Sequence, residues 1–472
     1  MHNATNRARW AIALCAAATL LAACANWKDE LLQPQNPGIV DQSAVGSPAA
    51  AAALKVGAMG ALKRVYADPA PTGFAGSSIW EASGLMSDEF MNSDFQNSQN
   101  DVDARTMSPD NTVSDYTRLT QARGYIRDAI AAEQQFEPQK TADIGELHMA
   151  LAFIEMTLAE NFCNGIPLGS NDRGVVDYSA PDFKPFTYAE VFDIALSHID
   201  SALTIVGAAV DSNSVAVRNA SLIVKARILV DKGGQFPQAA GLVTGIPSNY
   251  QYLFITQAST NNDDSGLWIL NNSISRMSVG DSTVTYLGKT VRTFNVIPFA
   301  SLNDPRVPIL KGTDAKLSSE DGSTPLFIQQ VYKGRDDPIP MVSGIDARLI
   351  EAEAKLSAGD FAGMMTILNA LRTAPPKIAN FQPLTMAALP TPGNKDAAID
   401  LFFREKALWQ FARGQRLSDL RRLVRQYGRS QDKVFPTGDH YKGGNYGSDT
   451  SFPVPDAERV NPQFTGCLDR NA

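Results

Sequence analysis

The sequence is poor in the residues from which disulfide frameworks, metal centres and basic surfaces are built. It contains four cysteines and four histidines among 472 residues, and its formal net charge is −8. Four cysteines in a chain of this length argue against a disulfide-stapled scaffold. An acidic balance argues against nucleic-acid binding, which depends on a basic electrostatic footprint. Neither class of protein is therefore predicted.

Common catalytic motifs are also absent. The sequence has no H-E-x-x-H metal site, no G-x-S-x-G nucleophile elbow, no P-loop and no dinucleotide-binding fingerprint. His148 and His198 lie within helical stripes and His440 lies in a Gly-rich loop, so none is paired at metal-ligand spacing. A glycoside hydrolase needs only two well-placed carboxylates, and it remains the enzymatic alternative. We expect no catalytic residue, no cofactor and no metal.

Long apolar runs are missing except near the start of the chain. Arg7 and Arg9 precede an uncharged run from Trp10 to Ala23, which is shorter than the roughly 20 residues of a membrane span. The run ends in LAAC, which resembles a bacterial lipobox and implies acylation of Cys24. An ordinary secreted protein is the alternative. Residues 1–23 are thus predicted to be a lipoprotein signal peptide and residues 24–47 a lipidated tether.

Two cysteines remain after this segment, Cys163 and Cys467. They could pair in an oxidising compartment, or each could be a small buried hydrophobic residue. The sequence leaves both possibilities open.

Helical periodicity dominates the rest of the chain. Thr187 and Glu190 have capping-box spacing, and Gly359 followed by Asp360 predicts the end of one helix and the cap of the next. A single domain is expected over residues 48–472, with helices at about 48–66, 113–135, 141–164, 187–245, 343–373 and 396–428. Less periodic segments with short β-prone stretches at 252–256, 267–270 and 282–287 are expected to form a lobe from residues 67–112, 246–340 and 430–472.

Residues 345–372, IDARLIEAEAKLSAGDFAGMMTILNALR, resemble a tetratricopeptide helix hairpin without its full signature. Such hairpins cannot bury their apolar faces alone and stack into a superhelix. The predicted fold is therefore mainly α, with a TPR-like α-α superhelical scaffold and an irregular, loop-rich lobe.

The order of motifs resembles the SusD/RagB family of outer-membrane nutrient-uptake lipoproteins. After the lipobox come LLQPQNPG (31–38), LNDPRVP (302–308), the helix pair at 349–372, REKALWQFARGQRLSDLRRL (404–423) and SFPVPDAERVNPQF (451–464). The turn at 410–414 departs from the family pattern, in which an acidic residue is usual. The resemblance covers essentially the whole chain in order.

The resemblance implies a surface-exposed outer-membrane lipoprotein that captures a nutrient and delivers it to a SusC-like TonB-dependent β-barrel. An oligosaccharide is the family default, and a peptide or another solute is the alternative. The paired surface tryptophans of starch-binding members have no counterpart here. An envelope scaffold protein is the alternative of another class. No nucleic acid is expected as a partner, and contact with the membrane is expected only through the lipid anchor.

Aromatic side chains in polar loops are the main candidates for ligand contacts, because binding sites combine an apolar platform with a few placed polar groups. One group of these lies in residues 73–105 and a second in 268–286. For Trp80 and Trp268 the alternative is burial in the core, and residues 267–270 (LWIL) are expected to form a buried strand. The candidates are Phe74, Trp80, Glu81, Asp88, Asp94, Phe95, Arg105, Trp268, Asn271, Arg276 and Tyr286.

The segment 401–429 carries eight Lys and Arg against two acidic residues. A nucleic-acid reader and a membrane-surface helix are both disfavoured, by the acidic chain and by the lipid anchor at Cys24. We expect a scaffold helix bent at Gly414. Its arginines are expected to pair with carboxylates while their stems cover apolar surface and their charged heads stay in water. The residues expected to face the core are Leu401, Phe402, Leu408, Trp409, Leu417, Leu420 and Leu423.

Overall fold

The computed structural model describes residues 46–67, 78–111, 113–169, 176–258 and 264–472. Ser47–Ala472 form one compact unit. The signal peptide, Cys24 with nearly all of its tether, and Phe74 lie outside the described residues, so the interpretations of these positions stay predictions. No described helix is both long enough and apolar enough to cross a membrane.

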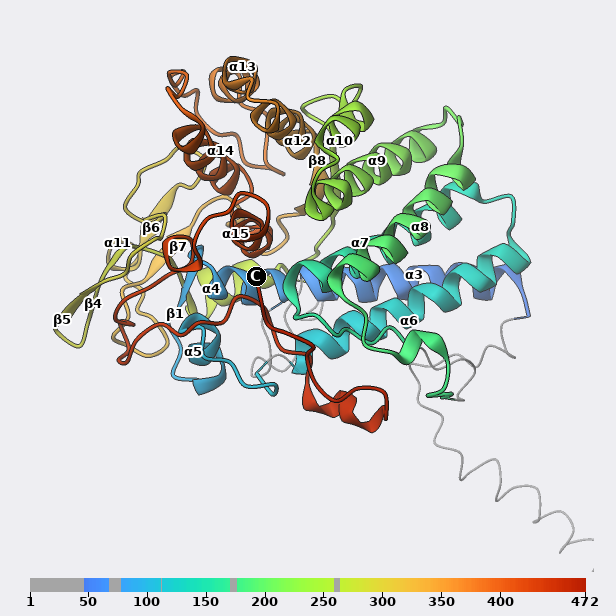
Figure 1. The fold of residues 1–472 in the computed structure, drawn as a ribbon, viewed down its shortest axis with the longest axis horizontal. Helices are drawn as coiled ribbons and strands as arrows, with labels where there is room; N and C mark the ends of the chain where they lie inside the picture. Colours follow the sequence, from blue (N-terminus) through green and yellow to red (C-terminus); the bar gives the residue numbers. More distant parts are fainter. Residues whose placement is uncertain (1–45, 68–77, 112, 170–175, 259–263) are drawn as a thin grey trace, which may run out of the picture. The chain divides into compact units, whose positions relative to one another are not determined.

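Helices stacked in chain order form the scaffold of this unit (Figure 1). From α6 to α14, each large helix packs against the next large helix along the chain. This arrangement confirms a mainly α, TPR-like scaffold. The large helices are α3 (Pro48–Tyr66), α6 (Val113–Phe136), α7 (Thr141–Asn161), α8 (Tyr188–Val206), α9 (Ser212–Lys232), α10 (Phe236–Val243), α12 (Gly344–Ser357), α13 (Phe361–Thr373), α14 (Lys395–Trp409) and α15 (Arg416–Arg425).

Local capping signals set several helix boundaries. The Glu190 carboxylate accepts the backbone N–H of Thr187 at 2.8 Å, while the Thr187 hydroxyl accepts that of Glu190 at 3.3 Å. This capping box starts α8 where the sequence predicts. Gly359, with φ of +75°, follows α12, and the Asp360 carboxylate caps α13 by accepting the N–H of Gly363 at 2.8 Å. The predicted turn is confirmed.

Helix α7 lies at the centre of the core. Every residue from Met149 to Asn161 is buried, because α6, α8, α9 and α15 pack around the helix. Its two buried glutamates are paired: Glu155 lies 3.0 Å from the Nε of Arg123, and Glu160 lies 2.6 Å from Nη2 of Arg227. Buried charges of this kind need such partners.

The lobe consists of short elements on one side of the scaffold (Figure 1). Its strands pair only two at a time, all antiparallel: β1 with β3, β4 with β5, and β6 with β7, while β2 pairs with β8 beside the helices. The strands are β1 (Phe90–Asn92), β2 (Gln251–Phe254), β3 (Met277–Val279), β4 (Thr283–Tyr286), β5 (Lys289–Arg292), β6 (Ile309–Lys311), β7 (Phe327–Gln329) and β8 (Ile339–Ser343). The short helices are α4 (Ile79–Met86), α5 (Asn97–Asp103), η2 (Pro181–Phe183), η3 (Trp268–Ser273), α11 (Gly312–Ala315), η4 (Gln431–Lys433) and η5 (Asp456–Val460).

The expected strand at 267–270 is wrong, because residues Trp268–Ser273 form a π-helix. Leu267 and Leu270 are both buried, and their three-residue spacing puts them on the same side of a helical turn. A short apolar run cannot distinguish a buried strand from a buried turn of helix. Strands are confirmed within the other two β-prone stretches, as β2 and β4.

The basic segment divides into α14 and α15 at residues 410–415, as the bend expected at Gly414 predicts. Gly414 has φ of +63°, and a Cβ placed there would lie 2.1 Å from Cδ1 of Trp80. The turn therefore needs glycine both for its left-handed backbone and for the close approach of the Trp80 ring.

Gly414→Ala is expected to lower the free energy of unfolding by about 2–4 kcal/mol, as the sum of left-handed strain and overpacking. Gly288→Ala is the matched control, because Gly288 also has positive φ (+79°) but nothing lies within 4 Å of its added Cβ. Urea unfolding of both variants gives the difference. Equal losses would show that contact with Trp80 contributes nothing.

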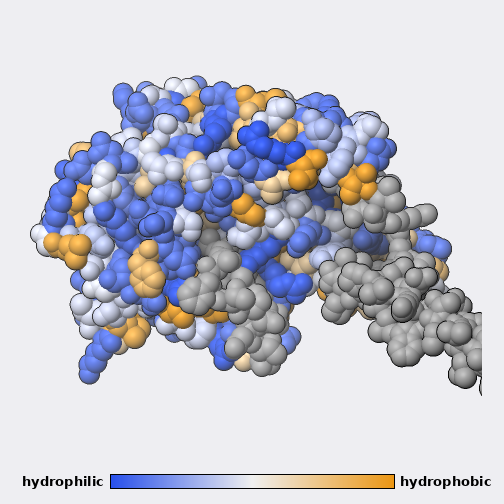
Figure 2. Space-filling model, turned by 90° about the horizontal axis from the view of Figure 1, so that it is seen from below, coloured by the Kyte–Doolittle hydropathy of each residue, from blue (hydrophilic) through white to orange (hydrophobic). Residues whose placement is uncertain are grey.

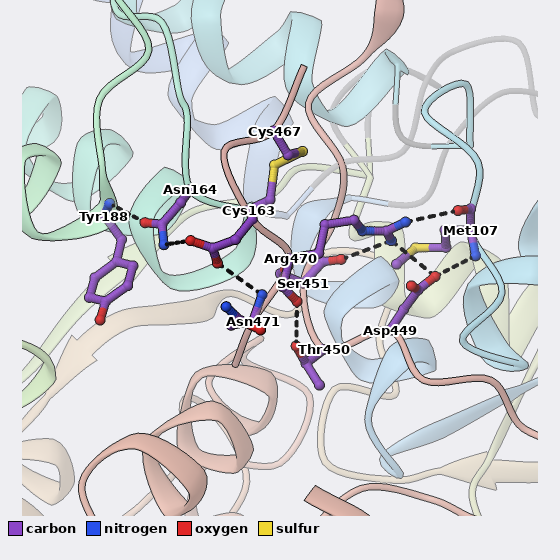
Figure 3. Close-up of a disulfide and its surroundings, with 11 residues drawn as sticks. Met107, Cys163, Asn164, Tyr188, Asp449, Thr450, Ser451, Cys467, Arg470 and Asn471 are labelled. Carbon is purple, nitrogen blue, oxygen red and sulfur yellow. Dashed lines mark hydrogen bonds and ion pairs between the residues drawn. A yellow bond between two sulfur atoms is a disulfide. The ribbon is translucent and has the colours of Figure 1, made fainter. Parts of the chain in front are cut away.

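A disulfide joins Cys163, just after α7, to Cys467 in the C-terminal segment (Figure 3). Asn164, the next residue, donates its side-chain N–H to Asp469 at 2.8 Å. Further along, Arg470 lies 2.9 Å from Asp449, which accepts the backbone N–H of Met107 at 2.7 Å. The C-terminal segment is therefore tied to the scaffold at Cys163 and to the lobe near Met107.

Four arginines of the basic segment are buried rather than solvated. Arg413, Arg416, Arg421 and Arg422 expose 7% of their surface or less. The expectation of solvated charged heads is wrong, because these side chains point into the interior and meet carboxylates or carbonyls brought there by distant parts of the chain. The apolar residues expected to face the core do so, with Leu417 and Leu420 almost fully buried.

Candidate functional site

Strands β1 and β3 bring the two predicted groups of ligand residues together. Their register places Asn92 opposite Met277. Just beyond the strands, the backbone N–H of Ser93 donates to the carbonyl of Arg276 at 3.1 Å. Asp94 and Phe95, from the first group, therefore lie beside Arg276, from the second.

Phe95 is an exposed aromatic side chain on a fixed backbone. It exposes 68% of its surface, whereas the neighbouring Asp94 is fully buried. The Asp94 carboxylate accepts the backbone N–H of Phe95 at 2.7 Å, and its other oxygen is 3.6 Å from Nε of Arg276. These contacts hold the backbone while the phenyl ring faces solvent, where it offers an open apolar surface to a ligand.

Lys442 contacts the backbone next to Phe95, and Tyr286 lies near Lys442. The Nζ of Lys442 donates to the carbonyl of Asp94 and lies 2.8 Å from the Asp321 carboxylate. The same ammonium is 5.9 Å from the centroid of the half-buried Tyr286 ring on the β4–β5 hairpin. Burial opposes ionisation of Asp321, but hydrogen bonds from Lys442 and Thr324 hold its pKa below the usual range.

Glu320 adds a half-exposed carboxylate, 3.7 Å from Nη2 of Arg276. Side chains of both charge signs thus lie beside the Asp94–Phe95 backbone, with no excess of cations. We call this group the Phe95 cluster; it consists of Asp94, Phe95, Arg276, Tyr286, Glu320, Asp321 and Lys442. Figure 2 shows one face of the molecule as mostly hydrophilic, with hydrophobic residues in small separate groups.

The described residues form no metal centre, and His440 is enclosed. No three His, Cys, Asp or Glu side chains in the described ranges group so as to hold a metal ion. His440 is 1% exposed, and its ring centroid lies 4.5 Å from that of Tyr441 and 5.1 Å from that of Tyr446. A histidine enclosed in this way has no open side for a substrate.

Trp80 and Glu81 do not face solvent, which corrects their expected role as ligand contacts. Trp80 is 4% exposed, and its ring centroid lies 5.3 Å from that of Tyr66 and 5.8 Å from that of Phe254. Glu81 accepts the backbone N–H of Ser78 at 2.6 Å and so caps its own helix. Burial raises the pKa of Glu81 to about 7.

Asp88, Arg105 and Asn271 are likewise buried and hold the fold together. Asp88 accepts two hydrogen bonds from Arg416, at 2.7 and 2.9 Å. Arg105 donates to the carbonyls of Asp449 and Pro436, at 2.7 and 2.6 Å. The Asn271 amide donates to two lobe carbonyls, at 2.7 and 3.0 Å. All three side chains are buried and bonded to distant parts of the protein, with only Nη2 of Arg105 left without a partner among the described residues. These residues are therefore structural.

Trp268 belongs to a second cluster. Its ring is half-buried, with the Arg335 guanidinium 6.0 Å from its centroid, and Nε of Arg335 lies 2.8 Å from Asp264. A ligand contact at Trp268 stays a prediction, as it does at Phe95, Arg276 and Tyr286. The expected contact at Asp94 is wrong, because its side chain is fully buried and its carboxylate accepts the backbone N–H of Phe95.

Three members of the Phe95 cluster are not among the sequence candidates. Lys442 lies in YKGGNYG (441–447), which has the same aromatic-in-polar-loop pattern that marks residues 73–105. Glu320 and Asp321 lie in SSEDGS (318–323), which carries no aromatic residue and therefore no such signal. Only the folded lobe brings all three to Phe95.

The fold is that of the SusD superfamily. A SusD superfamily protein from Bacteroides fragilis is 15% identical, with a TM-score of 0.59 over 88% of this chain and 98% of its own. A SusD-like carbohydrate-binding protein from the same organism is 13% identical, with a TM-score of 0.58 over 89% and 99%. A SusD/RagB family protein from Bacteroides thetaiotaomicron is 11% identical, with a TM-score of 0.55 over 86% and 93%.

No family model and no curated protein matches the chain. Each match covers nearly the whole of the matched protein at low sequence identity. What these proteins share with this chain is therefore the fold. The fold expected from the order of motifs is thereby confirmed.

Proposed function

We infer that the protein captures a nutrient ligand on its lobe and delivers it to a SusC-like TonB-dependent β-barrel. An oligosaccharide is the first candidate, because one protein of the same fold is described as carbohydrate-binding. A peptide or another solute captured in the same way is the second candidate. The protein is expected to be a binding protein rather than an enzyme.

The observation that carries this proposal is the exposed ring of Phe95, whose backbone segment is bordered by charged side chains. A sugar presents C–H faces that stack on an aromatic ring and hydroxyls that bond to the polar groups beside it. Arg276, Lys442 and Glu320 supply donors and acceptors at that border. The cluster therefore combines the two kinds of contact that small-molecule sites use.

The proposed location is the outer membrane, with a lipid anchor on Cys24 and the body facing the cell exterior. The lipobox-like LAAC is the basis for the anchor. The Cys163–Cys467 disulfide supports an exported location, because disulfides persist in oxidising compartments.

A glycan array and titration calorimetry on the purified full chain test the ligand class. Saturable binding of an oligosaccharide, recovered unchanged after incubation, is the expected result. Binding of peptides without any glycan would replace the first candidate with the second. Cleavage of the bound glycan would favour the hydrolase alternative.

Phe95→Ala is expected to weaken binding of the glycan found in this way by roughly two- to tenfold, since an aromatic contact contributes about 0.5–1.5 kcal/mol. The ring is exposed, so stability should stay within about 0.5 kcal/mol of wild type. Leu384→Ala is the matched control, because Leu384 is 73% exposed and lies outside the cluster. Unchanged affinity in Phe95→Ala would remove the Phe95 cluster from the proposal.

Recovery of partners from solubilised outer membrane separates nutrient uptake from an envelope scaffold. Uptake predicts that a large β-barrel copurifies with the chain. Recovery only of peptidoglycan-associated proteins would favour the scaffold.

A further inference from the structure

The basic residues of the segment 401–429 differ in their partners. Five of them lie within 4 Å of a carboxylate and Arg404 is exposed, whereas Arg421 and Arg425 have no carboxylate within that distance among the described residues. The five paired residues are Lys406, Arg413, Arg416, Arg422 and Arg429.

Arg421 is fully buried and uses only one of its terminal nitrogens. Its Nη1 donates to the carbonyls of Ala159 and Glu160 at the C-terminal end of α7, at 3.2 and 2.5 Å. Its Nε and Nη2 are inaccessible to solvent and have no hydrogen-bond partner among the described residues. These two nitrogens form the side edge of the guanidinium, whose parallel N–H groups match two oxygens of one anion.

Arg425 lies one helical turn further on and presents a second free edge. Its guanidinium lies 4.5 Å from the centroid of the Tyr188 ring, at the start of α8. Both terminal nitrogens, Nη1 and Nη2, are inaccessible to solvent and have no partner in the described part of the chain. Residues four apart lie on the same face of a helix, so the two guanidinium groups are neighbours.

Elsewhere in this protein, two arginines bind a carboxylate through a pair of guanidinium nitrogens. The side edge of Arg416 binds Asp88 at 2.7 and 2.9 Å. The end edge of Arg306 binds Glu405 at 2.7 and 3.0 Å. Arg421 thus offers the N–H groups of Nε and Nη2, and Arg425 offers those of Nη1 and Nη2, on one face of the helix. Together they are a donor set for an anion with several oxygens.

The nearby carboxylates are engaged elsewhere. Glu160 pairs with Arg227 at 2.6 Å, and burial raises its pKa well above the usual range. Asp469 accepts hydrogen bonds from the side chain of Asn164 at 2.8 Å and from the backbone N–H of Asn471 at 3.0 Å. Burial, with the charge of Arg425 beside it, lowers the pKa of Arg421 to about 9. Arg421 is fully buried and Arg425 partly so, and neighbouring guanidinium groups shielded from solvent without a paired anion are costly. A bound counter-ion would therefore stabilise the fold.

We propose that Arg421 and Arg425 form a binding site for a small oxyanion, such as phosphate or a carboxylate, between α15, the C-terminal end of α7 and Tyr188. The site is separate from the Phe95 cluster and does not depend on the proposed nutrient. Its occupant stabilises the fold by neutralising two guanidinium groups at once.

Thermal unfolding of the purified full chain tests this site with inorganic phosphate and with acetate, each titrated at constant ionic strength in chloride. The midpoint temperature of unfolding is expected to rise with the concentration of at least one of the two oxyanions and then to saturate. The oxyanion that raises it shows whether the site prefers phosphate or a carboxylate. Chloride has no pair of oxygens to meet a guanidinium edge. No dependence on either oxyanion, or an equal effect of chloride, would overturn the proposal.

Arg425→Lys is the decisive variant, because lysine keeps the charge but loses the two-nitrogen edge. We expect the oxyanion concentration at half-saturation to increase about tenfold or more. Arg429→Lys is the matched control, because Arg429 is paired with Asp396 and Asp400 at the surface, and it should respond as wild type does. If the half-saturation concentration stays unchanged in Arg425→Lys, Arg425 does not bind the anion.

Discussion

Arg422→Met is expected to lower the free energy of unfolding by about 3–5 kcal/mol, the largest single-residue effect that the structure predicts. Arg422 is fully buried among three carboxylates. It forms an ion pair with Glu353, and its guanidinium nitrogens lie 3.3 Å from Asp231 and 3.2 Å from Asp419. Methionine would fill much of the space but leave these carboxylates with less positive charge. Denaturant unfolding followed by circular dichroism measures the loss.

The loss should depend on pH. In the wild type, burial opposes ionisation of Glu353, but Arg422 and Lys406 hold its pKa below the usual range. That contribution to stability is present above the unfolded pKa of a glutamate and is lost as pH falls through the folded pKa. Without Arg422 the pKa of Glu353 should rise, because burial is then less opposed. The variant should therefore be less destabilised at pH 5 than at pH 8.

Arg429→Met is the control for this experiment. Arg429 also contacts two carboxylates, but Asp396 and Asp400 are 78% and 71% exposed. Surface ion pairs contribute about 0–1 kcal/mol. A loss in Arg422→Met no greater than in this control would show that the buried pairs do not stabilise the fold.

Removing the Cys163–Cys467 disulfide is expected to cost about 2–5 kcal/mol. The two cysteines are separated by 304 residues, and a cross-link over a long loop removes much conformational freedom from the unfolded chain. The double variant Cys163→Ala with Cys467→Ala should unfold at a lower guanidinium concentration than wild type under non-reducing conditions.

Reductant provides the control for the disulfide. A reducing agent should shift the wild-type midpoint toward that of the double variant, and it should leave the double variant unchanged. A wild-type midpoint that is insensitive to reductant, together with full reduction shown by thiol titration, would contradict the expected stabilisation.

Helices could be predicted from the sequence because their signals are local. The box formed by Thr187 and Glu190 lies within one turn, and Gly359 and Asp360 end one helix and cap the next. The apolar stripe of α15 is equally local, and Leu417 and Leu420 lie in the core as predicted. Only the order of motifs along the whole chain indicated how these helices and the lobe combine.

The partners of polar residues could not be predicted in the same way. Asp88 and Arg416 are 328 residues apart, and no local sequence pattern around either residue indicates that they form an ion pair. Trp80 lies in a polar segment, as a ligand-contacting tryptophan would. It packs instead against Gly414, which is also more than 300 residues away in the sequence. The Phe95 cluster was only partly predictable, since Asp94, Phe95, Arg276 and Tyr286 carry the signal of aromatic and polar residues while Asp321 does not.

The connection between Cys163 and Cys467 has a consequence for the order of events in biosynthesis. A chain is made from its N-terminus, so Cys163 is synthesised 304 residues before its partner. The bond can form only after both the scaffold helix α7 and the C-terminal segment have reached the same oxidising compartment. Under the proposed export, each cross-linked molecule has completed its passage across the membrane at least as far as Cys467. The disulfide then distinguishes fully translocated molecules from incompletely translocated ones.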